Sequence, residues 1–143
     1  AKALSAIRSM LTLQVSIALA LTLILFALAN QLVNVISGPQ FSDTATLVRM
    51  MAMFPVFVAL SNVFGVQTMV NFGMAKSFSR ILLCAGIINL VLLVLLVPTM
   101  VSKGAALSLV ASEGMVTLMM AYSLMRVGLL SPLLRKGGAA SVQ

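Results

Sequence analysis

Residues 81–102, "ILLCAGIINLVLLVLLVPTMVS", contain no charged side chain and are almost entirely apolar. More than about 18 such residues in succession can cross the hydrocarbon core of a bilayer as a helix. Two further charge-free runs, residues 9–42 and 50–75, exceed this length. The chain is 62% hydrophobic and 8% charged, with a mean hydropathy of +1.19, whereas soluble domains carry about 25% charged residues. The sequence therefore predicts an all-α integral membrane protein.

The net charge of +7 does not by itself indicate nucleic-acid binding. Such binding needs a clustered basic face with polar or aromatic reading groups, whereas these basic residues stand singly or in pairs at the ends of apolar runs. The chain has no His, a single Cys (Cys84), two carboxylates (Asp43 and Glu113) and no Gly-rich phosphate loop. These residues argue against an enzyme, a metal site and a bound cofactor.

We predict four membrane-spanning helices. Gly38 and Pro39 end the first of them, and Pro55 predicts a kink in the second. The predicted spans are residues 10–36, 42–75, 79–98 and 104–128, with a cytoplasmic lead-in at 1–9 and a cytoplasmic tail at 129–143. The small residues and Pro132 of this tail predict a disordered terminus.

The positions of the basic residues predict the orientation of these spans. Seven of the nine fall on one side of the membrane, and only Arg49 and Lys103 fall on the other. The positive-inside rule then places both termini and the loop at residues 76–80 in the cytoplasm. The seven residues are Lys2, Arg8, Lys76, Arg80, Arg126, Arg135 and Lys136.

Polar side chains inside the predicted spans are candidates for a site, because an amide in hydrocarbon is costly without a partner. In the first span Thr12, Ser16, Asn30 and Asn34 share one face, which indicates either packing against other helices or a cavity suited to sugar. The second span is polar on two sides, and we therefore expect a central helix surrounded by protein. The candidate cavity residues are Asn30, Asn34, Asn62, Gln67 and Asn71.

Glu113 lies near the middle of the fourth span, about 14 Å from its start. Asn89 reaches a similar depth on the third span. Two interpretations remain open for Glu113: a neutral, structural carboxyl bonded to Asn89 or to another helix, or a site of proton or cation coupling. Gly104, Ser108 and Ser112 precede it at intervals of four residues and predict a close helix–helix contact.

Several short motifs resemble the C-terminal region of bacterial polysaccharide flippases of the O-antigen type, which are relatives of the multidrug and toxin extrusion transporters. These motifs are the break before Phe41, "FGVQ" at residues 64–67, "GMAK" at 73–76, and "GAA" at 104–106 followed by "SE" at 112–113. The resemblance implies about twelve spans in two lobes around a cavity. It also implies a function in the bacterial inner membrane, namely flipping of an undecaprenyl-pyrophosphate-linked oligosaccharide for surface polysaccharide biosynthesis.

Four spans are too few for two lobes, so the resemblance implies that this chain is the last third of such a transporter, or a truncated product of one. Its partners would then be the remaining helices, membrane lipids and the lipid-linked oligosaccharide. Lys76 and Arg80 either set the orientation or attract the pyrophosphate at the cytoplasmic mouth. Two alternatives stay open: a stand-alone small multidrug transporter and a non-transporting membrane subunit.

The orientation can be tested by cysteine labelling in a Cys84→Ala background. We expect Ser77→Cys to react with an impermeant reagent only from the cytoplasmic side, and Gln40→Cys only from the opposite side, because of the seven-to-two distribution of basic residues. Labelling of both positions from one side would contradict the four-span topology.

Overall fold

The computed structural model describes residues 2–36, 38, 40 and 42–134. Throughout these residues the regular structure is helical and contains no strand, which confirms the all-α prediction. Four stretches are long and apolar enough to cross a membrane, namely Ser5–Ile36, Thr44–Val70, Ala75–Met100 and Ser102–Arg126. The helices are α1 (Lys2–Ile36), α2 (Ser42–Met51), α3 (Phe54–Asn62), the π-helix η2 (Val63–Val70), α4 (Ala75–Met100), α5 (Ser102–Arg126) and α6 (Leu130–Leu134).

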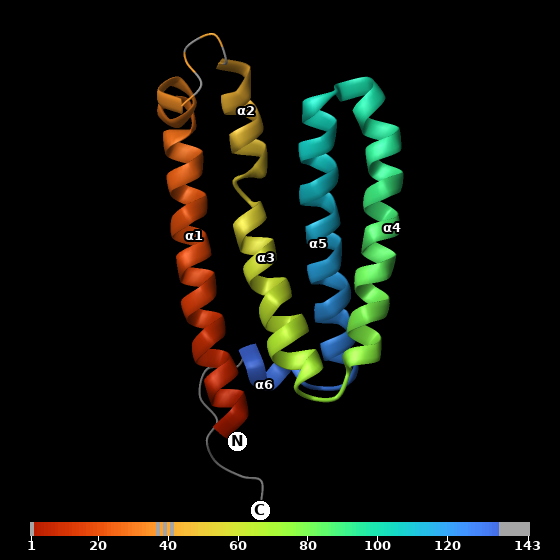
Figure 1. The fold of residues 1–143 in the computed structure, drawn as a ribbon. Coiled ribbons are helices and arrows are strands. Elements are labelled where there is room, and N and C mark those ends of the chain that lie inside the picture. Colours follow the sequence, from red (N-terminus) through yellow and green to blue (C-terminus); the bar gives the residue numbers. More distant parts are fainter. Residues whose placement is uncertain (1, 37, 39, 41, 135–143) are drawn as a thin grey trace, which may run out of the picture.

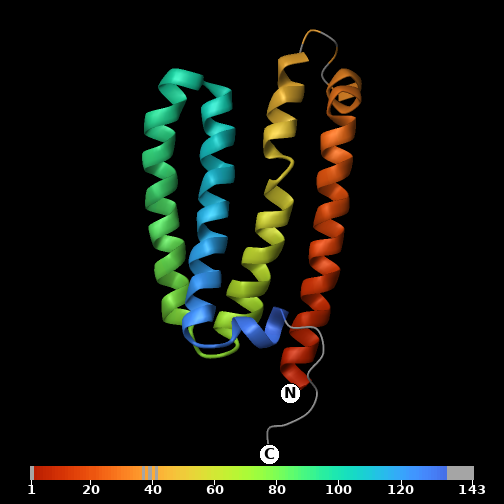
Figure 2. The same cartoon turned by 180° about the vertical axis from the view of Figure 1, so that it is seen from behind.

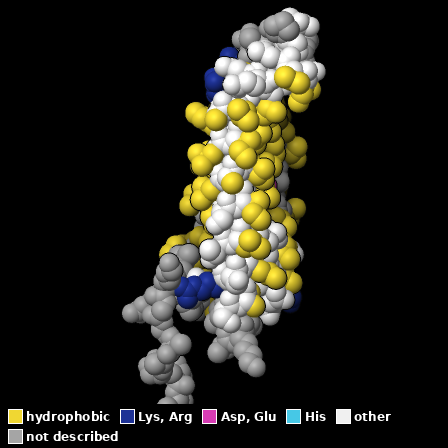
Figure 3. Space-filling model, turned by 90° about the vertical axis from the view of Figure 1, so that its left-hand side faces the viewer, with side chains coloured by type: hydrophobic (Ala, Val, Ile, Leu, Met, Phe, Trp, Pro, Cys, Tyr) yellow, Lys and Arg dark blue, Asp and Glu magenta, His cyan; other side chains and the backbone are white. Residues whose placement is uncertain are grey.

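The four long stretches stand side by side in the order α1, second span, α5 and α4 (Figures 1 and 2). The second span consists of α2, α3 and η2, and it contacts both α1 and α5. We call the end with the turn at Val101 the upper end, and the end with Lys76, Arg80 and α6 the lower end. Across the face on which α1 lies, hydrophobic side chains cover the middle, and basic side chains lie toward the two ends (Figure 3). This distribution is typical of a membrane-embedded bundle.

The second span is interrupted where the sequence predicts a kink. The break falls at Ala52 and Met53, and Pro55 occupies the first turn of α3. Pro55 has no N–H to give to the preceding turn, and the N–H of Val56 turns to the carbonyl of Met53 at 3.2 Å. The carbonyl of Ala52 thereby loses its partner within the helix.

A neighbouring helix supplies the missing hydrogen bond. The hydroxyl of Thr22 on α1 donates to the carbonyl oxygen of Ala52 at 2.6 Å, and Thr22 is buried. Because no water reaches the hydrocarbon core, a broken helix there must find its partners within the protein. We call this contact the Thr22–Ala52 bond.

Both ends of the chain carry more helix than the sequence predicts. Helix α1 begins at Lys2 and runs through most of the predicted lead-in, and α6 forms within residues 129–143, where we expected disorder. Leu130 and Leu133 of α6 are buried against the lower end of the bundle, and this burial explains why the segment folds. Residues 135–143 lie outside the described part of the chain.

An apolar cluster closes the lower end. Ile7 of α1, Met69 of η2, Leu124 of α5 and Leu133 of α6 belong to this single cluster, which we call the lower cluster. Met69, Leu124 and Leu133 are at most 1% exposed. Ile81 of α4 also belongs to this cluster, and Leu60 of α3 packs against it, so all described helices except α2 contribute to it.

Helices α4 and α5 approach each other closely near the upper turn. A Cβ atom on Gly104 would collide with the backbone carbonyl of Leu96, so no larger residue fits there. Ser108 and Ser112 continue the same strip and are buried. Each donates its hydroxyl to a carbonyl of α5 itself, at 2.7 and 2.6 Å, and can therefore be buried without a partner from another helix.

The Thr22–Ala52 bond should contribute measurably to stability. We expect Thr22→Val to lower the free energy of unfolding by about 1–3 kcal/mol, because the buried carbonyl of Ala52 is left unpaired. Thr12→Val is the matched control, since Thr12 donates to Arg8 of its own helix on an exposed face, and its effect should stay within about 0.5 kcal/mol. Equilibrium unfolding in detergent micelles measures both, and equal effects would exclude a special role for Thr22.

Candidate functional site

Glu113 of α5 lies at the contact between α3 and α5, within the membrane-spanning region. The Oε2 atom of Glu113 lies 3.5 Å from Ser61 Oγ, whose hydroxyl also donates to the carbonyl of Val58 at 3.1 Å. One turn further along α5, the hydroxyl of Thr117 lies 3.1 Å from the carbonyl of Phe57 and 2.9 Å from that of Glu113. Two polar contacts thus join α3 to α5 at mid-membrane depth.

Of the two structural partners left open for Glu113, Asn89 or another helix, the structure shows the second. In the described chain the side-chain contact of Glu113 is with Ser61 on α3, and the Oδ1 atom of Asn89 is buried without a hydrogen-bond partner. The reason is rotation about the α5 axis. The strip that contains Ser112 begins at Gly104, which packs on α4, and Glu113 lies about 100° further round the helix. It therefore faces α3 although its depth matches that of Asn89.

The π-helix η2 places the polar residues of the second span near the lower end. Thr68 donates to the carbonyl of Val63 at 2.8 Å, five residues back, and the amide of Asn71 donates to the carbonyl of Gln67 at 2.8 Å. These side chains satisfy carbonyls of the wider helix, and such segments often accompany functional sites. The Oε1 atom of Gln67 is buried and has no hydrogen-bond partner.

A glycine allows η2 to pack closely. A Cβ atom on Gly65 would lie 2.5 Å from the ring of Phe78 on α4 and 3.1 Å from the methyl group of Met120 on α5. Because η2 also contacts α1, it has helices on several sides. The second span nevertheless keeps an exposed side, which includes Val58 and Val66, so within these four spans it is not surrounded by protein as we expected.

The structure does not gather the five predicted cavity residues into one place. Asn30 and Asn34 lie in the last two turns of α1 at the upper end, and both are exposed. Gln67 and Asn71 lie toward the opposite end, and Asn62 lies between them, exposed at the end of α3. Within these four spans the five residues are spread along the membrane-spanning region, and their assignment to a cavity stays a prediction.

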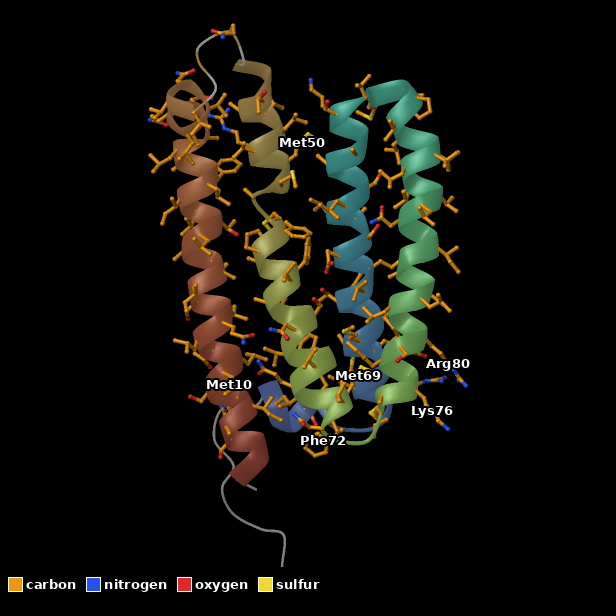
Figure 4. All side chains as sticks on the ribbon, viewed as in Figure 1. Met10, Met50, Met69, Phe72, Lys76 and Arg80 are labelled. Atoms are coloured by element: carbon orange, nitrogen blue, oxygen red, sulfur yellow. The ribbon has the colours of Figure 1, made fainter. Side chains whose placement is uncertain are left out.

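Lys76 and Arg80 lie on the first two turns of α4 and point away from the bundle at its lower end (Figure 4). Both side chains are exposed. A spacing of four residues puts them on one face of the helix, where they can contact the same anionic group.

Sequence reasoning missed the polar residues on the packed face of α1. The predicted stripe with Thr12, Ser16, Asn30 and Asn34 is exposed, whereas Gln14 and Thr22 lie on the face that packs against the second span. Ala18 and Ala29 could have indicated this packed face from the sequence, because both are small, lie on the same face as Thr22 and are buried. Small residues mark the side on which membrane helices approach each other.

The chain is similar to a curated bacterial protein. Over 101 residues the chain is 36% identical to the "Putative O-antigen transporter" of Escherichia coli (strain K12), and this match covers 71% of the chain. The chain spans only 24% of the length of that relative. No family model and no solved structure matches the chain. The resemblance to O-antigen transporters that the short motifs predict is confirmed by this similarity.

The role of Glu113 can be tested by two substitutions. If its carboxyl is structural, Glu113→Gln should change the free energy of unfolding by no more than about 0.5 kcal/mol, because the amide still bonds to Ser61, whereas Glu113→Ala should lower it by about 2 kcal/mol. Unfolding of the purified protein and its level in membranes are the measurements. A Gln variant that is stable and abundant but inactive in transport would instead indicate that the carboxyl must ionise.

Proposed function

Because the chain is related to an O-antigen transporter, we propose that it forms the last third of a twelve-helix, two-lobe flippase. This protein would move an undecaprenyl-pyrophosphate-linked oligosaccharide across the bacterial inner membrane for surface polysaccharide biosynthesis. The similarity over 71% of the chain, in a protein with four membrane-spanning helices, carries the proposal. Both ends of the segment are then cytoplasmic, as the basic residues predict.

The described polar groups fit a neutral, hydroxyl-rich cargo. The interior carries amides and hydroxyls on α1, α3 and η2, and Glu113 is its described carboxyl side chain. Amides both donate and accept hydrogen bonds, as sugar hydroxyls do, so the two chemistries match without a fixed charge. Helix partners beyond these four spans would cover the exposed apolar faces of α1 and α4.

Lys76 and Arg80 supply positive charges that can bind the negatively charged pyrophosphate. Both are exposed on one face at the lower end, which is the cytoplasmic end in the predicted orientation, and the cargo enters from that side. Arg and Lys form short, charge-assisted hydrogen bonds with phosphate oxygens. We infer that the pair attracts the headgroup at the cytoplasmic mouth before the sugar enters the bundle.

Complementation in the producing bacterium tests this function. Deleting the gene that encodes the chain should abolish surface polysaccharide and leave the lipid-linked oligosaccharide on the cytoplasmic side, and restoring the gene should reverse both. Failure of the deletion to affect export would contradict the proposed function.

The headgroup site is tested in the same cells. We expect Lys76→Gln with Arg80→Gln to lower export about tenfold, because about 1.4 kcal/mol of phosphate binding corresponds to a factor of ten. Arg49→Gln with Lys103→Gln, at the upper end, is the matched control with the same change in charge. Equal export by the two double variants, at equal protein level and unchanged topology, would restrict Lys76 and Arg80 to setting the orientation.

A further inference from the structure

A pocket lies at the upper end, between the beginning of α2 and the turn that joins α4 to α5 (Figure 1). Its volume is about 340 Å³, within the roughly 300–1,000 Å³ of pockets that bind small molecules. We call it the upper pocket. None of its lining residues takes part in the polar contacts described above for α3, η2 and Glu113. The lining residues are Thr44, Leu47, Met100, Val101, Ser102 and Lys103.

Three of the lining residues are polar, and one of them is charged. Lys103 supplies an ammonium group, and Thr44 and Ser102 supply hydroxyls that have no hydrogen-bond partner in the described part of the chain. The side chain of Asp43, which precedes Thr44, lies outside that part. Ammonium and hydroxyl groups both donate hydrogen bonds to phosphate oxygens, and the bond from the ammonium group is charge-assisted. The polar lining therefore fits an anion with several acceptor oxygens.

The beginning of α5 adds backbone donors at the same place. Val101 occupies the N-cap position without a capping side-chain hydrogen bond, and the first turn of α5 contains no acidic residue. The first N–H groups of a helix have no acceptor within the helix, and the helix dipole favours an anion beside them. Since Val101 and Ser102 themselves line the upper pocket, an anion bound there would be close to these N–H groups.

The other lining residues are apolar and mark the edge of the hydrocarbon core. Leu47, Met100 and Val101 form this part of the lining. One membrane-spanning stretch begins at Thr44 and another ends at Met100, so the upper pocket lies where the hydrocarbon core meets the lipid headgroups. A free anion gains nothing from apolar contacts, whereas the phosphate of a lipid arrives with apolar chains attached. The combined lining therefore fits a lipid headgroup better than a soluble anion.

We propose that the upper pocket binds the phosphate group of a membrane phospholipid, with an acyl chain along Leu47 and Met100. The described cation of the pocket, Lys103, matches the single negative charge of a phosphodiester. The pyrophosphate of the proposed cargo carries more charge, and Lys76 and Arg80 lie at the opposite end. The bound lipid would join α2 to the α4–α5 turn and stabilise the upper end of the bundle. This inference does not depend on what the protein transports.

Thermal unfolding of the purified full protein, stripped of lipid in detergent, tests the site with three probes. The first probe is dioleoyl phosphatidylglycerol, the second is dioleoylglycerol, which has the same chains without the phosphate, and the third is inorganic phosphate. Because a ligand of the folded state raises the melting temperature, we expect a clear rise with the phospholipid and little change with either of the other probes.

Charge variants test whether the phospholipid binds at the upper pocket. Lys103→Gln should raise the phospholipid concentration that gives half of the full shift about tenfold, because a charge-assisted hydrogen bond is lost. Arg49→Gln is the matched control, since Arg49 is also exposed at the upper end but does not line the pocket, and it should leave this concentration unchanged. Thr44→Val removes one hydroxyl and should raise it less than Lys103→Gln does. Asp43→Asn should leave it unchanged or lower it.

Four results would overturn the inference. Equal effects of Lys103→Gln and Arg49→Gln would mean that anionic lipid is attracted only by the charge of the whole surface. A full shift with inorganic phosphate would indicate a site for a free anion, and a full shift with dioleoylglycerol would indicate that the chains alone bind. Stronger stabilisation by undecaprenyl pyrophosphate than by phosphatidylglycerol, lost in Lys103→Gln, would assign the pocket to the cargo. None of these results would bear on whether the protein exports polysaccharide, which the gene deletion tests.

Discussion

The requirement that every backbone polar group in hydrocarbon finds a partner inside the protein governs this structure. Most of the chain meets it with unbroken helices, but the second span contains Pro55 and a break at Ala52 and Met53. The hydroxyl of Thr22 on α1 satisfies the freed carbonyl of Ala52. This bond joins α1 to the second span at the break, within a contact that runs along α2, α3 and η2.

Small residues determine how closely η2, α4 and α5 pack against one another. Lipid offers no hydrophobic drive for helix association, so contact depends on backbones that can approach. Gly104 lets α5 touch the backbone of α4 at Leu96, and Gly65 admits the ring of Phe78 beside η2. These contacts turn Glu113 toward α3, where it meets Ser61. Its surroundings therefore depend on the rotation that packing imposes on α5.

Three buried side-chain oxygens have no hydrogen-bond partner in the described chain, although several buried hydroxyl groups do. The oxygens of Gln14, Gln67 and Asn89 are buried without partners, whereas Thr68, Ser108, Ser112 and Thr117 all find carbonyls. A folded chain retains such unfavourable groups where a ligand or a further helix completes them.

The sequence by itself determined the membrane class, the four spans and the kink near Pro55, because these depend on hydrophobic length and on the missing N–H of proline, which are local properties. It also carried the resemblance to O-antigen transporters through short motifs. Only the tertiary structure decided which face of each helix is buried. Helices with polar residues on two sides have no unique orientation until their neighbours are placed. For this reason Gln14 was missed, and the partner of Glu113 stayed open between Asn89 and another helix. The segment of α6 was predicted to be disordered, although Leu130 and Leu133 are buried against distant helices.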